Sequence, residues 1–157
     1  MSASQLTVGV LSDTHGLLRA EVTAVLRGSD LLIHAGDIGT PEVLDQLREL
    51  APTFAVRGNV DTGKWAEALP RTEVVKAGPL CLYVLHELGQ LDLDPAAAEF
   101  AAVISGHTHR PSAESREGVL YLNPGSAGPC RFGLPVAVAR LIVLGTTIQH
   151  ENVVLQM

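Results

Sequence analysis

Carboxylate, amide and imidazole side chains recur directly after short apolar runs along this sequence. Asp37 ends the run Asp30-Leu-Leu-Ile-His-Ala-Gly-Asp37, and Asp13 and His15 follow a similar run. A site that mixes hard oxygen donors with imidazoles suits zinc and transition metals better than it suits calcium. The sequence therefore predicts a metal site built from distant segments. The polar residues that follow these apolar runs are, in chain order, Asp13, His15, Asp37, Asn59, His86, His107 and His109.

The spacing within two of these segments supports a pair of metals. In an extended segment, residues i and i+2 point the same way, so Asp13 and His15 can face one ligand together. His107 and His109 have the same spacing, and each could hold a different metal of a pair about 3.5 to 4 Å apart. A plainer alternative is that Asp13 caps the following helix and His15 lies at the surface. His34 fits a hydrogen-bonded core group better than a ligand.

Parallel strands separated by helices would bring these residues to one place. In open α/β sheets the carboxyl ends of the strands line the crevice where ligands bind. A hairpin would deliver His86 to the same edge, and a strand at 102–104 would deliver His107. Apolar spacing and turn signals predict strands at 6–11, 30–37 and 53–56, helices at 17–27, 41–50 and 94–100, hairpin strands at 72–76 and 80–85, and a second, largely antiparallel sheet from 112–116, 119–122, 136–144 and 148–155.

Length and composition indicate one aliphatic α/β domain over residues 1–157. The chain is 46% hydrophobic but only 4% aromatic, and its formal net charge is -6. That charge argues against an extended nucleic-acid surface or attachment to an anionic membrane. The N-terminus lacks the pattern of a secretory signal, and Cys81 and Cys130 have no metal or redox spacing. We expect a cytoplasmic protein with reduced thiols.

Taken in order, the segments Asp13-x-His15, Gly36-Asp37, Gly58-Asn59, His86 and Gly106-His107-x-His109 resemble the calcineurin-like metallophosphoesterase superfamily, in its small single-domain phosphodiesterase branch. Residues 123–126, Asn-Pro-Gly-Ser, resemble the last motif of that branch. The resemblance implies a four-layer α/β/β/α sandwich of two mainly mixed β-sheets flanked by helices. It also implies a dinuclear site for divalent metal ions, with Mn²⁺ expected in vitro and Fe, Ni or Zn as alternatives.

Roles for individual residues follow from the same resemblance. Asp13, His15 and His109 would bind one metal, Asn59, His86 and His107 would bind the other, and Asp37 would bridge both. Asp37, Asn59 and His107 would then serve in catalysis. The implied reaction is hydrolysis of a phosphate ester, most simply a diester, by a metal-bridging hydroxide. The substrate would be a small phosphate ester, with nucleotide-derived esters among the candidates.

Three positions bear on how the site would work. Val60 stands where many superfamily members carry a histidine, which predicts weak general-acid assistance to the leaving group. Glu87 replaces a usual glycine after His86 and would alter the substrate mouth. Asp61 fits either a turn former or a residue that supports the ligands.

Two other functions are compatible with the pattern. A protein-binding scaffold could retain the fold without catalysis, although a scaffold is free to lose its ligands and all seven are present here. A structural metalloprotein is disfavoured, because closed structural sites seldom combine an asparagine with a bridging carboxylate. The aliphatic C-terminal strands could also supply a homo-oligomer interface.

Overall fold

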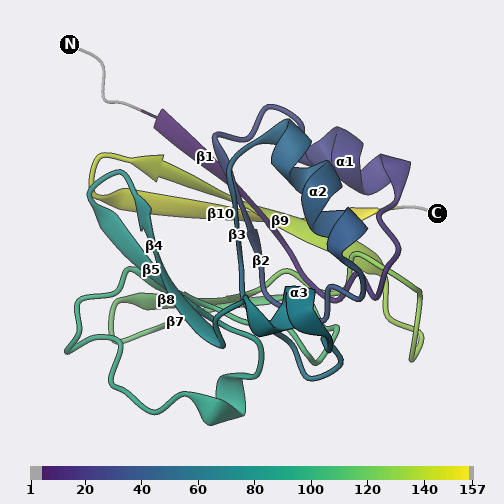
Figure 1. Cartoon of the computed structure of the whole chain (residues 1–157). Coiled ribbons are helices and arrows are strands. Elements are labelled where there is room, and N and C mark those ends of the chain that lie inside the picture. Colours follow the sequence, from purple (N-terminus) through teal and green to yellow (C-terminus); the bar gives the residue numbers. More distant parts are fainter. Residues whose placement is uncertain (1–4, 156–157) are drawn as a thin grey trace.

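The computed structural model describes residues 5–155, which form two five-stranded sheets and a few short helices (Figure 1). The first sheet has the strand order β10-β9-β1-β2-β3. In it β1, β2 and β3 are parallel, whereas β9 and β10 run antiparallel to their neighbours. Its strands are β1 (Gln5–Leu11), β2 (Leu31–His34), β3 (Thr53–Ala55), β9 (Val136–Leu144) and β10 (Thr147–Leu155).

The second sheet has the order β4-β5-β6-β8-β7 and is also mixed. Its three central strands, β5, β6 and β8, are parallel, and the flanking β4 and β7 are antiparallel to them. The α/β architecture of two mixed sheets predicted from the sequence is therefore confirmed. The strands are β4 (Thr72–Ala77), β5 (Leu80–Leu85), β6 (Ala102–Ile104), β7 (Ser112–Arg116) and β8 (Val119–Asn123).

Aliphatic side chains fill the space between the sheets. Successive residues of a strand point to opposite faces, so Ile33 packs between the sheets while its neighbour Leu32 packs under the helices. Both are fully buried, as in central strands covered on both faces. Ile104 and Leu82 enter the same inter-sheet core from the second sheet. The core therefore fixes the position of one sheet relative to the other.

Helices α1 (Ala20–Leu26) and α2 (Pro41–Leu50) cover the outer face of the first sheet (Figure 1). Helix α2 begins with Pro41, whose fixed φ suits a first helical position. Helix α1 begins three residues later than predicted, because the backbone before it makes other bonds. Gly16 N–H donates to the Ile38 carbonyl, and Leu17 N–H donates to the Thr14 carbonyl, so these residues form a turn. A third helix, α3 (Lys64–Glu67), is a single turn.

The outer face of the second sheet is covered by irregular chain rather than by a helix. The predicted helix at 94–100 is a series of turns, and a 3-10 turn, η1 (Leu88–Gln90), precedes it. Asp94 Oδ1 accepts hydrogen bonds from the Ala96 and Ala97 amides, as expected of an N-cap. Glu99, however, has a φ of 63°, which ends helical propagation.

The last two strands do not join the second sheet, so that part of the prediction is wrong. Strand β9 pairs with β1, and β10 pairs with β9. Only β7 and β8 of the four predicted strands belong to the second sheet. The register places Val8 opposite Leu141 and buries both between the sheets. Strand β9 therefore occupies the side of β1 that β2 leaves free, and it adds side chains to the core between the sheets.

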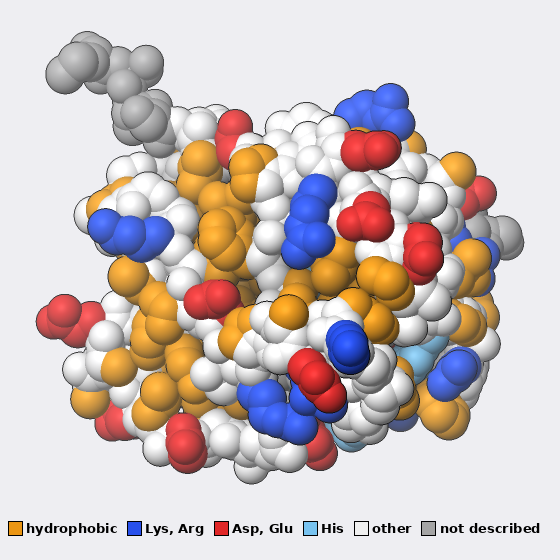
Figure 2. All heavy atoms as spheres, viewed as in Figure 1, with side chains coloured by type: hydrophobic (Ala, Val, Ile, Leu, Met, Phe, Trp, Pro, Cys, Tyr) orange, Lys and Arg blue, Asp and Glu red, His pale blue; other side chains and the backbone are white. Residues whose placement is uncertain are grey.

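On the face that Figure 2 shows, acidic and basic side chains are intermixed, so charge of a single sign does not cover it. Over residues 5–155, no helix combines the length and the hydropathy needed to cross a bilayer. Strand β10 forms one edge of the first sheet and carries an exposed Val154. An oligomer interface there stays a prediction.

We expect Ile33→Ala to lower the free energy of unfolding by about 2 to 5 kcal/mol, because it leaves a cavity between the sheets. Val154→Ala on β10 is the matched control, since this side chain is 55% exposed. It should change stability by less than about 0.5 kcal/mol. Urea unfolding followed by circular dichroism measures both, and equal small effects would contradict the assigned core.

Candidate metal centre

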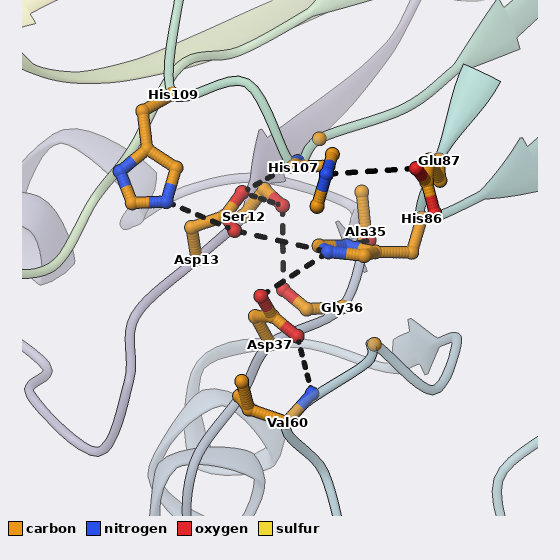
Figure 3. Close-up of polar contacts among 12 residues, drawn as sticks. Ser12, Asp13, Ala35, Gly36, Asp37, Val60, His86, Glu87, His107 and His109 are labelled. Atoms are coloured by element: carbon orange, nitrogen blue, oxygen red, sulfur yellow. Dashed lines mark hydrogen bonds and ion pairs between the residues drawn. The ribbon is translucent and has the colours of Figure 1, made fainter. Parts of the chain in front are cut away.

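Two groups of ligand atoms lie side by side, and Figure 3 labels all of their residues except His15. Asp13, His15 and His109 form the first group, and within it the ligand atoms lie within 4.8 Å of one another. The second group meets the same limit. It consists of Asp37, His86 and His107.

Both sheets contribute to each group. Asp13 and Asp37 lie just beyond β1 and β2 of the first sheet, and His86 follows β5 of the second. His107 and His109 lie in the loop after β6. The site therefore depends on how the inter-sheet core positions these strand ends.

Asp13 holds its two carboxylate oxygens in different environments. Oδ2 accepts hydrogen bonds from the Ser12 hydroxyl at 2.7 Å and from the His107 amide at 3.0 Å. Oδ1 is buried, has no hydrogen-bond partner within residues 5–155, and lies 3.3 Å from His109 Nε2. One oxygen thus fixes the carboxylate, and the other is free to bind a cation.

Asp37 shows the same division. Its Oδ1 accepts a hydrogen bond from the Val60 amide at 3.0 Å. Its Oδ2 lies 3.2 Å from His86 Nε2 and 3.9 Å from His15 Nε2. This oxygen therefore faces one histidine from each ligand group.

Local contacts set the charge and the tautomer of the second group. Burial alone would raise the pKa of Asp37, but hydrogen bonds from His86 and Val60 outweigh it and lower the pKa to about 2. Burial likewise lowers the pKa of His86, yet the hydrogen bond and charge of Asp37 raise it overall. His86 Nδ1–H donates to the Ala35 carbonyl at 2.7 Å, which directs Nε2 towards the centre. Metal-binding histidines are commonly oriented by such a bond.

The amide of Asn59 also points into the second group. One of its terminal atoms lies 3.2 Å from each oxygen of Asp37 and 3.0 Å from His86 Nε2. As nitrogen, that atom donates to the Asp37 oxygens. As oxygen, it faces the two oxygens of the Asp37 carboxylate, an arrangement that a cation would stabilise. Asn59 is thus placed either to bind a metal through its oxygen or to donate hydrogen bonds to Asp37 through its nitrogen.

The arrangement fits divalent metal ions. Asp13 Oδ1 and His15 Nε2 are both buried and lack hydrogen-bond partners among the described residues. Buried polar atoms are normally paired, so unpaired ones that converge need an explanation. A cation near both atoms provides it, and the mixture of carboxylate, amide and imidazole suits Mn, Fe, Ni or Zn.

The ligand loops do not have the extended backbone expected from the sequence. Five of the seven candidate ligands have left-handed φ values, between 48° and 74°. Non-glycine residues adopt this region rarely, and such strain is typical of functional sites. The side chains still converge, but they do so through tight turns rather than through the alternation of a strand. These residues are Asp13, His15, Asp37, His107 and His109.

Asp61 does more than form a turn. Its carboxylate accepts hydrogen bonds from the amides of Ile38, Gly39 and Gly58, at 3.2, 2.9 and 2.9 Å. It is almost fully buried and joins the loop that carries Asp37 to the loop that carries Asn59. Of the two roles considered for Asp61, support of the ligands is the one that the contacts favour.

His34 is a buried structural group, as expected. Its Nε2 lies 3.0 Å from the Thr14 hydroxyl, and its Nδ1 accepts a hydrogen bond from the Gly36 amide. The Thr14 hydroxyl in turn donates to the Ile38 carbonyl. This chain of bonds ties the loop after β1 to the loop after β2. Burial lowers the pKa of His34 to about 3, so its ring is neutral at pH 7.

Several supporting residues were not predicted from the sequence. Asn123 Nδ2 donates to the Gly106 carbonyl and to the Thr108 hydroxyl, which fixes the loop that carries His107. The Ser126 hydroxyl donates to the Asp13 carbonyl. The turn signals of residues 123–126 marked this segment, but they gave no indication of its contacts.

Comparison with known proteins decides the family. The model of the calcineurin-like phosphoesterase superfamily domain matches residues 6–144. The chain belongs to this superfamily. A probable metallophosphoesterase of Methanocaldococcus jannaschii is 36% identical over 134 residues, which cover 77% of this chain and 68% of that protein. The phosphodiesterase YfcE of Escherichia coli is 29% identical over 160 residues, covering 83% and 84% of the two chains.

The same fold also occurs in Vps29. The crystal structure of Vps29 complexed with Zn²⁺ from Entamoeba histolytica matches with a TM-score of 0.73 at 22% identity. The match covers 95% of this chain and 99% of that one. At this identity the likeness establishes the fold alone, so function has to be argued from the site of this superfamily member.

We expect Asp61→Asn to weaken both the fold and the metal site of this calcineurin-like domain. The substitution replaces one acceptor oxygen with an amide donor that faces backbone N–H groups. Stability should fall by about 1 to 3 kcal/mol, and Mn²⁺ affinity should fall about tenfold or more. Asp45→Asn on the exposed side of α2 is the control. Thermal unfolding and calorimetric Mn²⁺ titration measure the two effects, and wild-type values for Asp61→Asn would contradict the assigned role.

His34 should make the stability of the metal-free protein depend on pH. The folded-state pKa of about 3 lies below the ordinary value of 6.5, so between these values the unfolded state binds more protons. This contribution to stability is complete above pH 6.5 and is lost as the pH falls towards 3. The raised pKa of His86 acts in the opposite direction, so the comparison must be made with a variant.

His34→Gln should therefore be less sensitive to acid than the wild type. In urea titrations with EDTA at pH 4.5 and 7.5, the stability difference between the two proteins should shrink at the lower pH. A difference that is the same at both pH values would show that His34 titrates normally in the folded state.

Proposed function

We propose that this protein is a dinuclear-metal-dependent phosphodiesterase. The observation that carries the proposal is the closeness of the two ligand groups, because Asp37 Oδ2 of the second group lies 3.2 Å from His86 Nε2 and 3.9 Å from His15 Nε2 of the first. Such a carboxylate can bind two cations and offset part of their repulsion. The relatives named metallophosphoesterase and phosphodiesterase support the same reaction class.

The proposed ligand sets follow the two groups. Asp13, His15 and His109 would hold one metal, and Asn59, His86 and His107 would hold the other, with Asp37 shared. Two carboxylates and two dications leave this centre with a net positive charge, which suits an anionic phosphate. Mn²⁺ is the metal expected to support activity in vitro, with Fe, Ni or Zn as alternatives.

When bound, two divalent metals lower the pKa of a shared water and neutralise charge on the phosphoryl oxygens. The chain supplies the positioning. Asp13 and Asp37 are each fixed by backbone hydrogen bonds, so little reorganisation is needed to bind the cations. His107 is the most exposed of the histidine ligands and lies where a substrate would enter.

The residue after Asn59 limits assistance to the leaving group. The Val60 amide donates a hydrogen bond to Asp37. The Val60 side chain is exposed and has no proton that it could donate to a leaving group. We therefore propose that the enzyme prefers phosphate esters with good leaving groups. A small-molecule substrate fits this site, and nucleotide-derived esters are candidates.

A protein-binding scaffold is the alternative on the same fold. The Vps29 match is one reason to retain it. The complete set of seven donors argues for catalysis, because a scaffold needs neither the buried carboxylates nor the strained loops that present them.

Asp37→Asn should reduce metal-dependent hydrolysis of bis-p-nitrophenyl phosphate by more than about 100-fold. Loss of a residue that merely supports a ligand costs 10- to 100-fold, and Asp37 would contact both metals. EDTA should abolish wild-type activity, and Mn²⁺ should restore it. Glu67→Gln, at an exposed position of α3, should retain full activity. Absence of Mn²⁺-dependent turnover in the pure wild type, or its persistence in Asp37→Asn, would refute the proposal.

A further inference from the structure

A cavity of about 320 Å³ opens beside the second ligand group. It lies between the loop after β6, the segment after β5 and the outer face of β7 and β8. His107 lines it and also belongs to the proposed metal centre, so the two spaces adjoin. Its size is at the lower end of the range for small-molecule sites, roughly 300 to 1,000 Å³. The cavity can therefore take one part of a substrate whose phosphate lies at the metals.

Charge in this cavity is unbalanced. Two carboxylates, Glu87 and Glu114, line it against a single guanidinium, that of Arg116. Arg116 Nη2 lies 3.0 Å from Glu114 Oε2, so these two charges offset each other. The guanidinium also lies over the ring of Tyr121, 4.9 Å from its centroid. Arg116 is thus already engaged and is poorly placed to attract a second anion.

Glu87 carries the remaining charge. Its Oε1 lies 3.6 Å from His107 Nε2, and its Oε2 accepts a hydrogen bond from Gln90 Nε2 at 3.3 Å. Across residues 5–155, no lysine or arginine lies within ion-pair distance of Glu87. A negative charge therefore stands at the boundary between the metal centre and the cavity (Figure 3).

We infer that the cavity holds the leaving-group half of a phosphodiester and selects leaving groups that carry a positive charge. The inference rests on the proposed phosphodiesterase function and adds a substrate class to it. A phosphate held at the metals extends its leaving group past His107, where Glu87 is the first charged side chain that the group meets. A cation there is attracted by Glu87, whereas an anionic leaving group is repelled by the same carboxylate.

Two substrates of equal shape and different charge test this selection. They are the methyl phosphodiesters of 3-(trimethylammonio)phenol and of 3-tert-butylphenol. The measured quantity is the ratio of kcat/KM for the cationic ester to kcat/KM for the neutral one, in Mn²⁺-loaded enzyme. Differences in intrinsic reactivity cancel when this ratio is compared between variants. A variant that only loses metal slows both substrates equally and leaves the ratio unchanged.

Glu87→Gln should lower the ratio about threefold to fivefold, the size expected for one partly exposed charge pair. Arg116→Gln should raise it, because Glu114 is then no longer neutralised. Glu151→Gln, on β10 and paired with Arg140, is the control and should leave the ratio as in the wild type. An unchanged ratio in Glu87→Gln, with both esters hydrolysed, overturns the inference alone. Failure of the wild type to hydrolyse either ester overturns the proposed function and the inference with it.

Discussion

This structure depends on the contacts between two buried carboxylates, those of Asp13 and Asp37, and the histidine side chains around them. His86 Nε2 lies 3.2 Å from Asp37 Oδ2 and 4.0 Å from Asp13 Oδ1, so a single ring stands between the two acids. Burying like charges together is unfavourable unless hydrogen bonds and opposite charges compensate. Each carboxylate meets this requirement with one oxygen, which backbone amides hold, and leaves the other directed at the centre. The same division stabilises the acids and keeps one atom of each available for a metal.

The geometry of the loops follows from the need to bring these groups together. Left-handed backbone at five ligand residues stores strain of about 1 to 3 kcal/mol each, which the rest of the fold must offset. Close approach of the loops adds a second requirement. A Cβ on Gly58 would lie 2.1 Å from the Asp37 amide nitrogen, and one on Gly106 would lie 2.0 Å from the Ser12 hydroxyl oxygen. Glycine is needed at both positions because the backbone itself packs against the carboxylate loops.

The sequence predicted the elements and the ligand clustering more successfully than it predicted long-range pairing. Strand ends were visible because apolar runs stop abruptly before polar residues such as Asp13 and Asp37. By contrast, the pairing of β9 with β1 depends on which sheet edge is free, and no local pattern reports that. In the segment 94–100, Asp94 acts as an N-cap, but the left-handed backbone at Glu99 prevents the predicted helix. The role of Asp61 was ambiguous because its three partners lie on two loops that become neighbours only after folding.

The packing between the sheets links stability to chemistry. Each ligand group takes residues from both sheets, so a small shift of one sheet would separate His86 and His107 from Asp37 or His109 from Asp13. Aliphatic packing at Ile33 and Ile104, a few residues before Asp37 and His107, resists such a shift. A binding surface on the outside of the sandwich would need no such accuracy between the sheets. Within residues 5–155, the buried ligand atoms without hydrogen-bond partners therefore argue that the precision of this core serves the proposed metal centre, whereas the fold alone is compatible with other functions.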